Sequence, residues 1–159
     1  MEHIYPQSPH AQWSDDVTVA TRSKRAKSAI TNSLGNLLLL SISVNSQLSN
    51  QPYCSFGELA GKRQRFLGGS YSEMQVGRLC ERWSVVQIAA KGIAMMRLAQ
   101  RTWEFTVVRE EEPLTAWLPL LFGDVADDVQ AGRYSNGRKV DGRALIPWVR
   151  KFEDRSQVM

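Results

Sequence analysis

The spacing of apolar residues between Val85 and Trp103 constrains the fold more than any other feature of this sequence. Apolar or small residues recur there at alternating steps of four and three, at Val85, Ala89, Gly92, Met96, Ala99 and Trp103. Steps of this size place side chains on one face of an amphipathic helix. We therefore predict a long helix over this segment, with its methionines filling a core.

Two Ser-x-x-Glu sequences predict the starts of further helices upstream. This spacing is typical of a capping box, in which each side chain bonds the backbone N–H of the other residue. We expect one helix over residues 55–67, ended by a glycine pair, and a second over about 70–83. The segment 21–33, rich in Ser, Lys and Arg, fits either a short helix or a loop.

The last third of the chain differs in character from the rest. An acidic stretch that ends at Pro113 predicts a break, and it is followed by an apolar run. Two turn signals that contain glycine, at 135–137 and 140–142, predict a small hairpin. We expect residues 1–105 to form one unit and residues 106–159 to form a C-terminal appendage, in which we recognise no chemistry.

Length and composition limit the class of protein. The chain has 159 residues, 43% hydrophobic and 23% charged, which fits one ordinary domain and excludes wholesale disorder. Its longest aliphatic run, Leu37–Leu40, is far shorter than the about 20 apolar residues of a membrane span, and the N-terminus does not have the pattern of a signal peptide. Two cysteines, Cys54 and Cys80, are too few for a disulfide framework or a four-cysteine zinc site. We expect a cytoplasmic protein with two reduced thiols and no membrane partner.

The positive charge lies mostly in the first two-thirds of the chain. The net charge is +4, which favours an acidic partner. The excess gathers in two stretches, Arg22–Lys27 and Lys62–Arg65. Such stretches are either ordinary solvated faces or contacts for an acidic partner.

Four features stand in an order that can build a metal-dependent site. Glu2 and His3 are adjacent, Asn36 precedes the apolar run Leu37–Ile42, and Asn45 follows that run. We predict the run to be a buried strand. Successive side chains of an extended segment point in opposite directions, so one of Glu2 and His3 can hold a metal while the other faces a substrate. Asn36 can tie a loop to backbone groups, Asn45 can return a carbonyl oxygen to the metal, and oxygen ligands suit magnesium.

This order and spacing resemble the HNH, or ββα-metal, endonucleases, with asparagine in place of the final histidine. The sequences Glu-His-Ile-Tyr-Pro-Gln at 2–7, Leu-Gly-Asn-Leu-Leu-Leu-Leu at 34–40 and Asn-Ser-Gln-Leu-Ser-Asn at 45–50 are similar to the C-terminal domain of GmrSD-type restriction endonucleases. The similarity extends from residue 2 to about 105. It implies an α+β fold, in which a small ββα-metal (HNH) core is followed by a helical region and a C-terminal appendage.

The resemblance also implies roles for individual residues. His3 would be the general base that takes a proton from the attacking water, and Asn36 would orient the loop and the histidine. Glu2 and Asn45 would be ligands of one Mg²⁺ or Mn²⁺, which would stabilise the transition state and the leaving 3′ oxygen. The implied function is a magnesium-dependent endonuclease domain that hydrolyses DNA phosphodiester bonds, as the C-terminal part of a modification-dependent restriction system.

Two other interpretations remain open. The chain can be a catalytically impaired fragment of such a protein that binds DNA through its basic stretches, at Arg22, Lys24, Arg25, Lys27, Lys62, Arg63 and Arg65. It can also be a helical structural protein in which the motifs are accidental. Because only Met1 precedes Glu2, we expect a fragment that folds but cleaves weakly or not at all, with an upstream nucleotide-hydrolysing domain or subunit as its partner. The nuclease interpretation also predicts that Leu37–Ile42 pairs antiparallel with a strand near Glu2–Tyr5.

Overall fold

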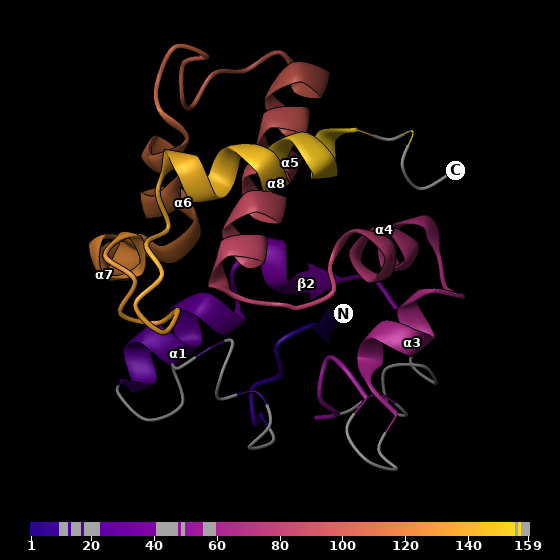
Figure 1. Ribbon diagram of the computed structural model, residues 1–159. Coiled ribbons are helices and arrows are strands. Elements are labelled where there is room, and N and C mark those ends of the chain that lie inside the picture. The colour runs from indigo at the N-terminus through magenta and orange to yellow at the C-terminus, as the bar shows by residue number, and fades with distance from the viewer. Residues whose placement is uncertain are drawn as a thin grey trace.

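The computed structural model of the chain describes residues 1–9, 13, 17, 23–40, 48, 50–55, 60–154 and 156. Helices form most of this part of the chain, and the first residues pair with a later segment in a small sheet (Figure 1). In chain order the elements are β1 (Glu2–His3), α1 (Lys24–Thr31), η3 (Leu34–Asn36), β2 (Leu37–Leu38), α3 (Lys62–Phe66), α4 (Tyr71–Leu79), α5 (Val85–Trp103), η4 (Leu114–Trp117), α6 (Leu118–Phe122), η5 (Gly123–Val125), α7 (Ala126–Gln130) and α8 (Gly142–Glu153), where η marks a 3-10 helix.

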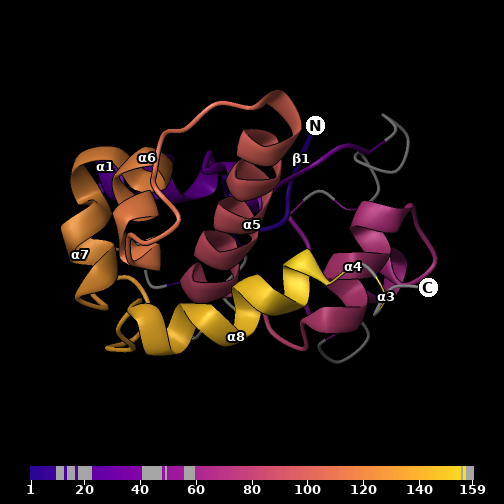
Figure 2. The same cartoon turned by 90° about the horizontal axis from the view of Figure 1, so that it is seen from above.

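The long helix predicted from the apolar periodicity is confirmed as α5, which forms the centre of the fold. Ser84 begins it, because its hydroxyl accepts from the N–H of Val86 and its own N–H donates to the side chain of Gln87. Residues 85–94 are all buried, whereas the C-terminal half of the helix reaches solvent and Trp103 is 71% exposed. The predicted apolar face is therefore core only over its first half. α8 crosses α5 and covers one side of it (Figures 1 and 2).

A close contact between two glycines sets the position of the sheet on α5. η3 packs against α5 so tightly that a Cβ atom on Gly35 would lie 1.8 Å from the carbonyl oxygen of Ile88 and 2.7 Å from the nitrogen of Gly92. Any side chain at position 35 would push the two elements apart. Because Asn36 and β2 follow Gly35 directly, this contact fixes where they lie.

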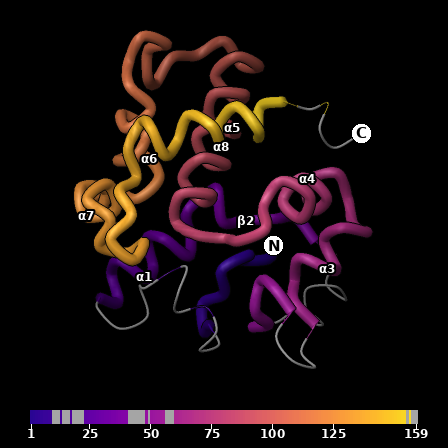
Figure 3. Tube along the Cα trace, in the orientation of Figure 1, coloured from indigo at the N-terminus to yellow at the C-terminus, as the bar shows by residue number. Residues whose placement is uncertain are grey.

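The sheet has the pairing that the nuclease interpretation predicts. β1 runs antiparallel to β2, with Glu2 opposite Leu38 and His3 opposite Leu37, and the N-terminus lies beside β2 in the tube view (Figure 3). The N–H of Ile4 extends the pairing with a 2.9 Å bond to the carbonyl of Asn36. The antiparallel pairing is confirmed, and β2 as described is two residues long. Residues 41–42 of the predicted strand lie outside the described residues.

The predicted helices differ from the observed ones mainly at their ends. The capping box at Ser70 is confirmed, but α4 ends at Leu79, since Cys80 is extended and Ser84 already caps the next helix. Within the helix predicted over 55–67, the structure describes α3, which begins at Lys62, and residues 56–59 lie outside the described residues. Ser55 accepts a hydrogen bond from the N–H of Gly61, the residue that precedes α3. The undecided segment 21–33 contains a helix, α1.

The hairpin predicted for the C-terminal part is wrong. The turn signal at 135–137 forms a tight turn in which Asn136 and Gly137 have φ values of 55° and 80°. In the second signal, the side chain of Asp141 accepts from the N–H of Ala144 and begins α8. Turn residues and helix caps have the same chemistry, and the sequence signal does not separate them. The predicted boundary at residue 105 stays a prediction.

The C-terminal helix α8 packs into the core. Phe152 of α8 contacts Trp83 edge to face, with ring centroids 6.5 Å apart. α1 packs against α6 and η5 on the other side of the molecule. Among the described residues, none of the helices has the length and apolar composition of a membrane-spanning segment. The buried apolar residues of the described helices and of the small sheet form one hydrophobic core. The α+β class is confirmed, whereas the ββα-metal core stays a prediction.

Candidate functional site

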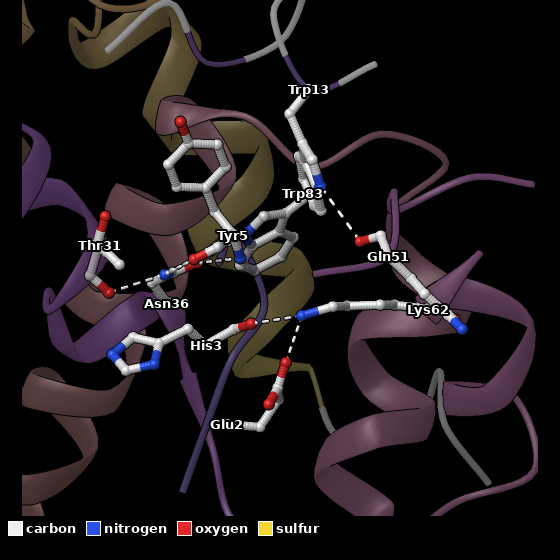
Figure 4. A network of polar contacts seen from close by, with 9 residues as sticks. All are labelled: Glu2, His3, Tyr5, Trp13, Thr31, Asn36, Gln51, Lys62 and Trp83. Atoms are coloured by element: carbon white, nitrogen blue, oxygen red, sulfur yellow. Dashed lines mark hydrogen bonds and ion pairs between the residues drawn. The ribbon is translucent and has the colours of Figure 1, made fainter. Parts of the chain in front are cut away.

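Asn36 is the centre of the polar network beneath β1 (Figure 4). Its side chain is completely buried and makes four hydrogen bonds. The amide nitrogen donates to the carbonyls of Tyr5 and Thr31, each at 2.8 Å, and the amide oxygen accepts from the N–H of Tyr5 at 2.8 Å and from the indole of Trp83 at 3.1 Å. Both donors and the acceptor of this amide are thus used. Asn36 ties the end of α1, the segment after β1 and the start of α5 together.

Aromatic rings surround this network and keep water from it. The ring of Tyr5 meets Trp13 edge to face at 5.3 Å, and Tyr53 lies between Trp13 and Trp83 at 6.2 and 6.0 Å. Burial raises the pKa of the Tyr5 hydroxyl to about 12. Hydrogen bonds are stronger in such a water-poor setting, and an unmade one is costlier. Nothing in the sequence marks Trp83 as the partner of Asn36, because 47 residues separate them.

His3 lies half-buried on β1, and its ring is held by a residue that the sequence did not single out. Its Nε2 lies 3.1 Å from the side-chain oxygen of Asn32, which follows α1. The amide nitrogen of Asn32 donates to the hydroxyl of Ser28, at 3.2 Å, and its amide oxygen is the atom that faces the histidine. An amide oxygen only accepts, hence Nε2 carries the proton in the neutral ring and Nδ1 is left as a base.

Glu2 forms a buried ion pair with Lys62, the first residue of α3. The Lys62 side chain is completely buried, and its ammonium donates to Oε1 of Glu2 and, at 2.8 Å, to the backbone carbonyl of His3 (Figure 4). Burial lowers the pKa of Lys62, against the hydrogen bond and the charge of Glu2, which raise it. The proposed DNA contact of Lys62 is therefore wrong: its charge is bound inside the protein and cannot reach a phosphate.

The other predicted DNA-contacting residues lie in different surroundings. Arg25 is exposed, but its guanidinium pairs with Asp124 of η5. Arg63 is half-buried, and its Nε donates to the carbonyl of Gly77 at 3.0 Å. Lys24 is exposed, Lys27 and Arg65 are partly exposed, and Arg22 lies outside the described residues. DNA binding by these residues stays a prediction.

One face of α1 leads from its exposed N-terminal lysine to the histidine. Lys24, Ser28 and Asn32 follow one another at intervals of four residues, which places them on one side of the helix and its C-cap. Ser28 holds Asn32, and Asn32 holds the ring of His3. This polar face of α1 therefore ends at the imidazole of His3.

Glu2 is the one expected metal ligand that the structure describes, and a carboxylate is the type of donor that magnesium prefers. Magnesium keeps several waters, so it needs few protein ligands. Since Oε1 of Glu2 bonds Lys62, its Oε2 is the atom left for a cation. The second expected ligand, Asn45, lies outside the described residues. Within the described ranges, no three His, Cys, Asp or Glu side chains gather to form a larger metal cluster.

Comparison with known families identifies the chain. The family model described as "GmrSD restriction endonucleases, C-terminal domain" matches residues 1–98. The chain belongs to this family. The matched residues include β1, Asn36, Lys62 and most of α5, and they leave out the C-terminal part that we could not match from the sequence. No curated protein and no solved structure matches the chain. The resemblance inferred from the motifs at 2–7 and 34–50 is confirmed.

Proposed function

We propose that this GmrSD C-terminal domain is a magnesium-dependent HNH endonuclease that hydrolyses DNA phosphodiester bonds. The observation that carries the proposal is the support of His3, whose strand is anchored through Asn36 and whose Nε2 is held by Asn32. An imidazole fixed in this tautomer presents Nδ1 as a general base. Histidine is the side chain that most often transfers protons in catalysis near neutral pH.

In this mechanism His3 takes a proton from the water that attacks the phosphorus atom. The scissile phosphate would lie on the Nδ1 side of the imidazole, opposite the ring nitrogen that Asn32 holds, and bond cleavage would leave 5′-phosphate and 3′-hydroxyl ends. Asn36 contributes by position alone, because all its polar atoms are already bonded within the protein. It fixes the backbone of Tyr5, two residues after the base.

Glu2 and Asn45 are the residues that would hold the magnesium or manganese ion. When bound, the ion supplies positive charge to the transition state and to the leaving 3′ oxygen. Lys62 keeps Glu2 on β1 through Oε1. The same ammonium donates to the backbone carbonyl of His3. One lysine side chain therefore supports both Glu2, the proposed metal ligand, and His3, the proposed base.

The decisive experiment is nicking of supercoiled plasmid in the presence and absence of Mg²⁺. We expect magnesium-dependent nicking by the wild-type chain and a loss of about 10²- to 10⁴-fold in His3→Ala. His10→Ala is the matched control, since His10 is the other histidine of the chain and belongs to no motif. Far-UV circular dichroism should be the same for all three proteins. Cleavage that survives in His3→Ala would contradict the proposal.

A second candidate function, DNA binding without turnover, is favoured by the Glu2–Lys62 ion pair. A carboxylate already neutralised by an ammonium binds a divalent cation less strongly than a free one. If the wild-type chain binds DNA but does not nick it with Mg²⁺ or Mn²⁺, this candidate replaces the first. Replacing Lys24 and Lys27 by alanine should then reduce the slope of log affinity against log salt by up to about two. The control is the exposed pair Arg138 and Lys139, whose replacement should leave the slope unchanged.

The partner and the compartment follow from the same proposal. A nucleotide-hydrolysing domain or subunit would act with this chain in a modification-dependent restriction system. We propose that the system works in the cytoplasm, where both DNA and reduced thiols are found. Cys54 is exposed and Cys80 is buried. Stimulation of nicking by the separately purified partner, in the presence of nucleoside triphosphate, would test this arrangement.

A further inference from the structure

An open apolar groove lies beside the sheet, between β2 and the helices α4, α5 and α8. Its volume is about 820 Å³, and aliphatic side chains form most of its wall. Three of them are unusually exposed for their size: Leu39 at 77%, Leu98 at 40% and Met95 at 39%. A contiguous exposed apolar surface of this kind marks a site of association. We refer to it as the apolar groove.

The apolar groove contains one charge, the side chain of Lys91. This side chain is buried, and its ammonium donates to the carbonyl of Leu37 at 2.9 Å and contacts the sulfur of Met95 at 3.4 Å. Across the described ranges no carboxylate pairs with it. An ammonium has three donors, so one of them is left for a group that enters the groove. Burial lowers the pKa of Lys91 to about 8, which an entering carboxylate would reverse.

The complementary feature lies at the C-terminal end of the same helix. Trp103, Phe105 and Val107 are exposed by 71%, 44% and 51%, and Glu104 between the first two carries an exposed carboxylate. We refer to residues 103–107 as the apolar ridge. Among the described residues, no ion pair involves Glu104.

The apolar ridge is held rigidly rather than as a loose tail. The side chain of Gln100 accepts from the N–H groups of Val107 and Val108, at 2.6 and 3.0 Å, and donates to the carbonyl of Val108 at 3.1 Å. Glu104 ends α5 in the left-handed conformation, with φ of 53°. A surface that is already ordered loses little entropy on binding, so its apolar side chains contribute more of their burial to affinity.

We propose that the chain forms a symmetric dimer, in which the apolar ridge of each copy occupies the apolar groove of the other. The carboxylate of Glu104 from one copy pairs with the ammonium of Lys91 in its partner. The two surfaces are complementary in polarity and in charge. The apolar ridge enters the apolar groove, and the carboxylate of Glu104 meets the ammonium of Lys91, neither of which has an ion-pair partner among the described residues of its own chain. The groove is lined in part by α5 and the ridge begins at its last residue, so a single twofold axis can exchange the two features and close the assembly at two copies.

The choice of a second copy rests on this complementarity within one sequence. A partner of another kind would have to bring its own apolar segment with a carboxylate, and would leave the ridge uncovered. Exchange between two copies covers both features at once. The inference is independent of the proposed nuclease activity, since it concerns only the association of the chain.

Oligomeric state as a function of concentration tests the proposal. Sedimentation velocity and light scattering from about 1 to 200 μM should show a species of about twice the 18.0 kDa of the chain. Leu98→Glu in the groove and Trp103→Ser in the ridge should each raise the dimer dissociation constant by at least about tenfold, which is about 1.4 kcal/mol. Glu104→Gln should weaken the dimer by a smaller factor, and Glu111→Gln, in the nearby acidic stretch, is its matched control. Both Leu98 and Trp103 are partly or largely exposed, so melting temperatures should stay near that of the wild type.

Mixing two variants gives the sharpest result. A Leu98→Glu copy keeps an intact ridge, and a Trp103→Ser copy keeps an intact groove, so a mixed dimer retains one of the two contacts. Association should therefore be partly restored in the mixture, relative to either variant alone. A wild-type chain that stays monomeric at 200 μM, or a dimer that persists unchanged in both variants, would overturn the proposal, and the groove would then belong to another partner.

Discussion

Two buried lysines mark two regions of this molecule that differ in almost every other respect. Lys62 lies in the polar centre under β1, where Glu2 neutralises its charge and the carbonyl of His3 accepts a second bond. Lys91 lies beside β2 in the apolar groove, where a carbonyl and a methionine sulfur are its contacts. In both cases burial lowers the pKa of the ammonium.

The difference lies in what each charge can still do. The ammonium of Lys62 is committed to internal partners, so it acts as a fixed part of the framework that supports His3 and Glu2. The ammonium of Lys91 has no internal counter-charge in the described structure, so it retains the capacity to bind one. A buried cation is therefore informative about function only when its partners are known.

The polar centre should be most sensitive at Asn36. Replacing Asn36 by alanine removes four hydrogen bonds and leaves the N–H of Tyr5 and the indole of Trp83 without an acceptor. Because each unsatisfied buried group costs about 1–3 kcal/mol, we expect a loss of at least about 4 kcal/mol in the free energy of unfolding. Urea denaturation measures it, and Asn50→Ala on the exposed surface should change the stability little. A small loss in Asn36→Ala would show that water replaces the amide and that the centre is not dry.

The ion pair of Lys62 should behave as a coupled unit. Lys62→Met leaves the carboxylate of Glu2 buried without its partner, which we expect to cost about 3–5 kcal/mol. Adding Glu2→Gln to that variant should recover a large part of the loss, because no charge is then left unpaired. The exposed ion pair of Arg25 and Asp124 provides the contrast, since its loss should cost no more than about 1 kcal/mol. If the losses of stability in Lys62→Met and Glu2→Gln simply add in the double variant, the two side chains are not coupled. The contrast between a paired Lys62 and an unpaired Lys91 would then fail.

The unpaired state of Lys91 predicts a dependence of stability on pH. Its pKa is lowered from 10.5 to about 8 in the folded chain, so between these values the unfolded chain binds more protons. The free energy of unfolding should therefore rise with pH from about 8 to 10.5, relative to a Lys91→Met variant, by at most about 3 kcal/mol. Urea denaturation of both proteins at about 1 μM, across this range, measures the difference. If the two curves run parallel, a counter-charge neutralises Lys91 and the comparison with Lys62 fails.

The smallest expected effect concerns Asn32, which joins α1 to the proposed base. Asn32→Ala frees Nε2 of His3, so we expect nicking to fall by about tenfold through kcat while the fold is kept. Ser28→Ala, which removes only the bond that orients Asn32, should give a smaller loss. The ring ¹⁵N shifts of His3 give a second measurement, since the fixed tautomer of the wild type should become a mixture. Unchanged shifts would show that Asn32 does not select the tautomer.

Features that depend on neighbouring residues could be predicted from the sequence. The apolar spacing predicted α5, the capping box predicted the start of α4, and the paired motifs predicted the antiparallel contact of β1 with β2. The same motifs led to the restriction endonuclease family that the comparison confirms. Each of these signals is contained within a few residues, or in the spacing of short segments that the family keeps together.

The partners of the polar side chains could not be predicted in this way. The basic stretch around Lys62 suggested a DNA contact, and its buried ion pair with Glu2 joins residues 60 positions apart. Of the hydrogen-bond partners of Asn36, Tyr5 and Trp83 lie 31 and 47 residues away in the chain. The hairpin signals of the C-terminal part proved to be a turn and a helix cap. A lysine or an asparagine has the same local pattern whether it faces solvent or a core.

The sequence by itself thus determined where the long central helix lies, how the small sheet pairs and which family the chain belongs to. Only the tertiary structure decided that Lys62 neutralises Glu2, that Asn32 holds His3 and that Lys91 lies in an open apolar groove. The physical reason is that helix periodicity and capping depend on residues a few positions apart, whereas the state of a charge depends on burial. Burial is created when segments far apart in the chain pack together, as α3 does on β1 and α5 does on β2.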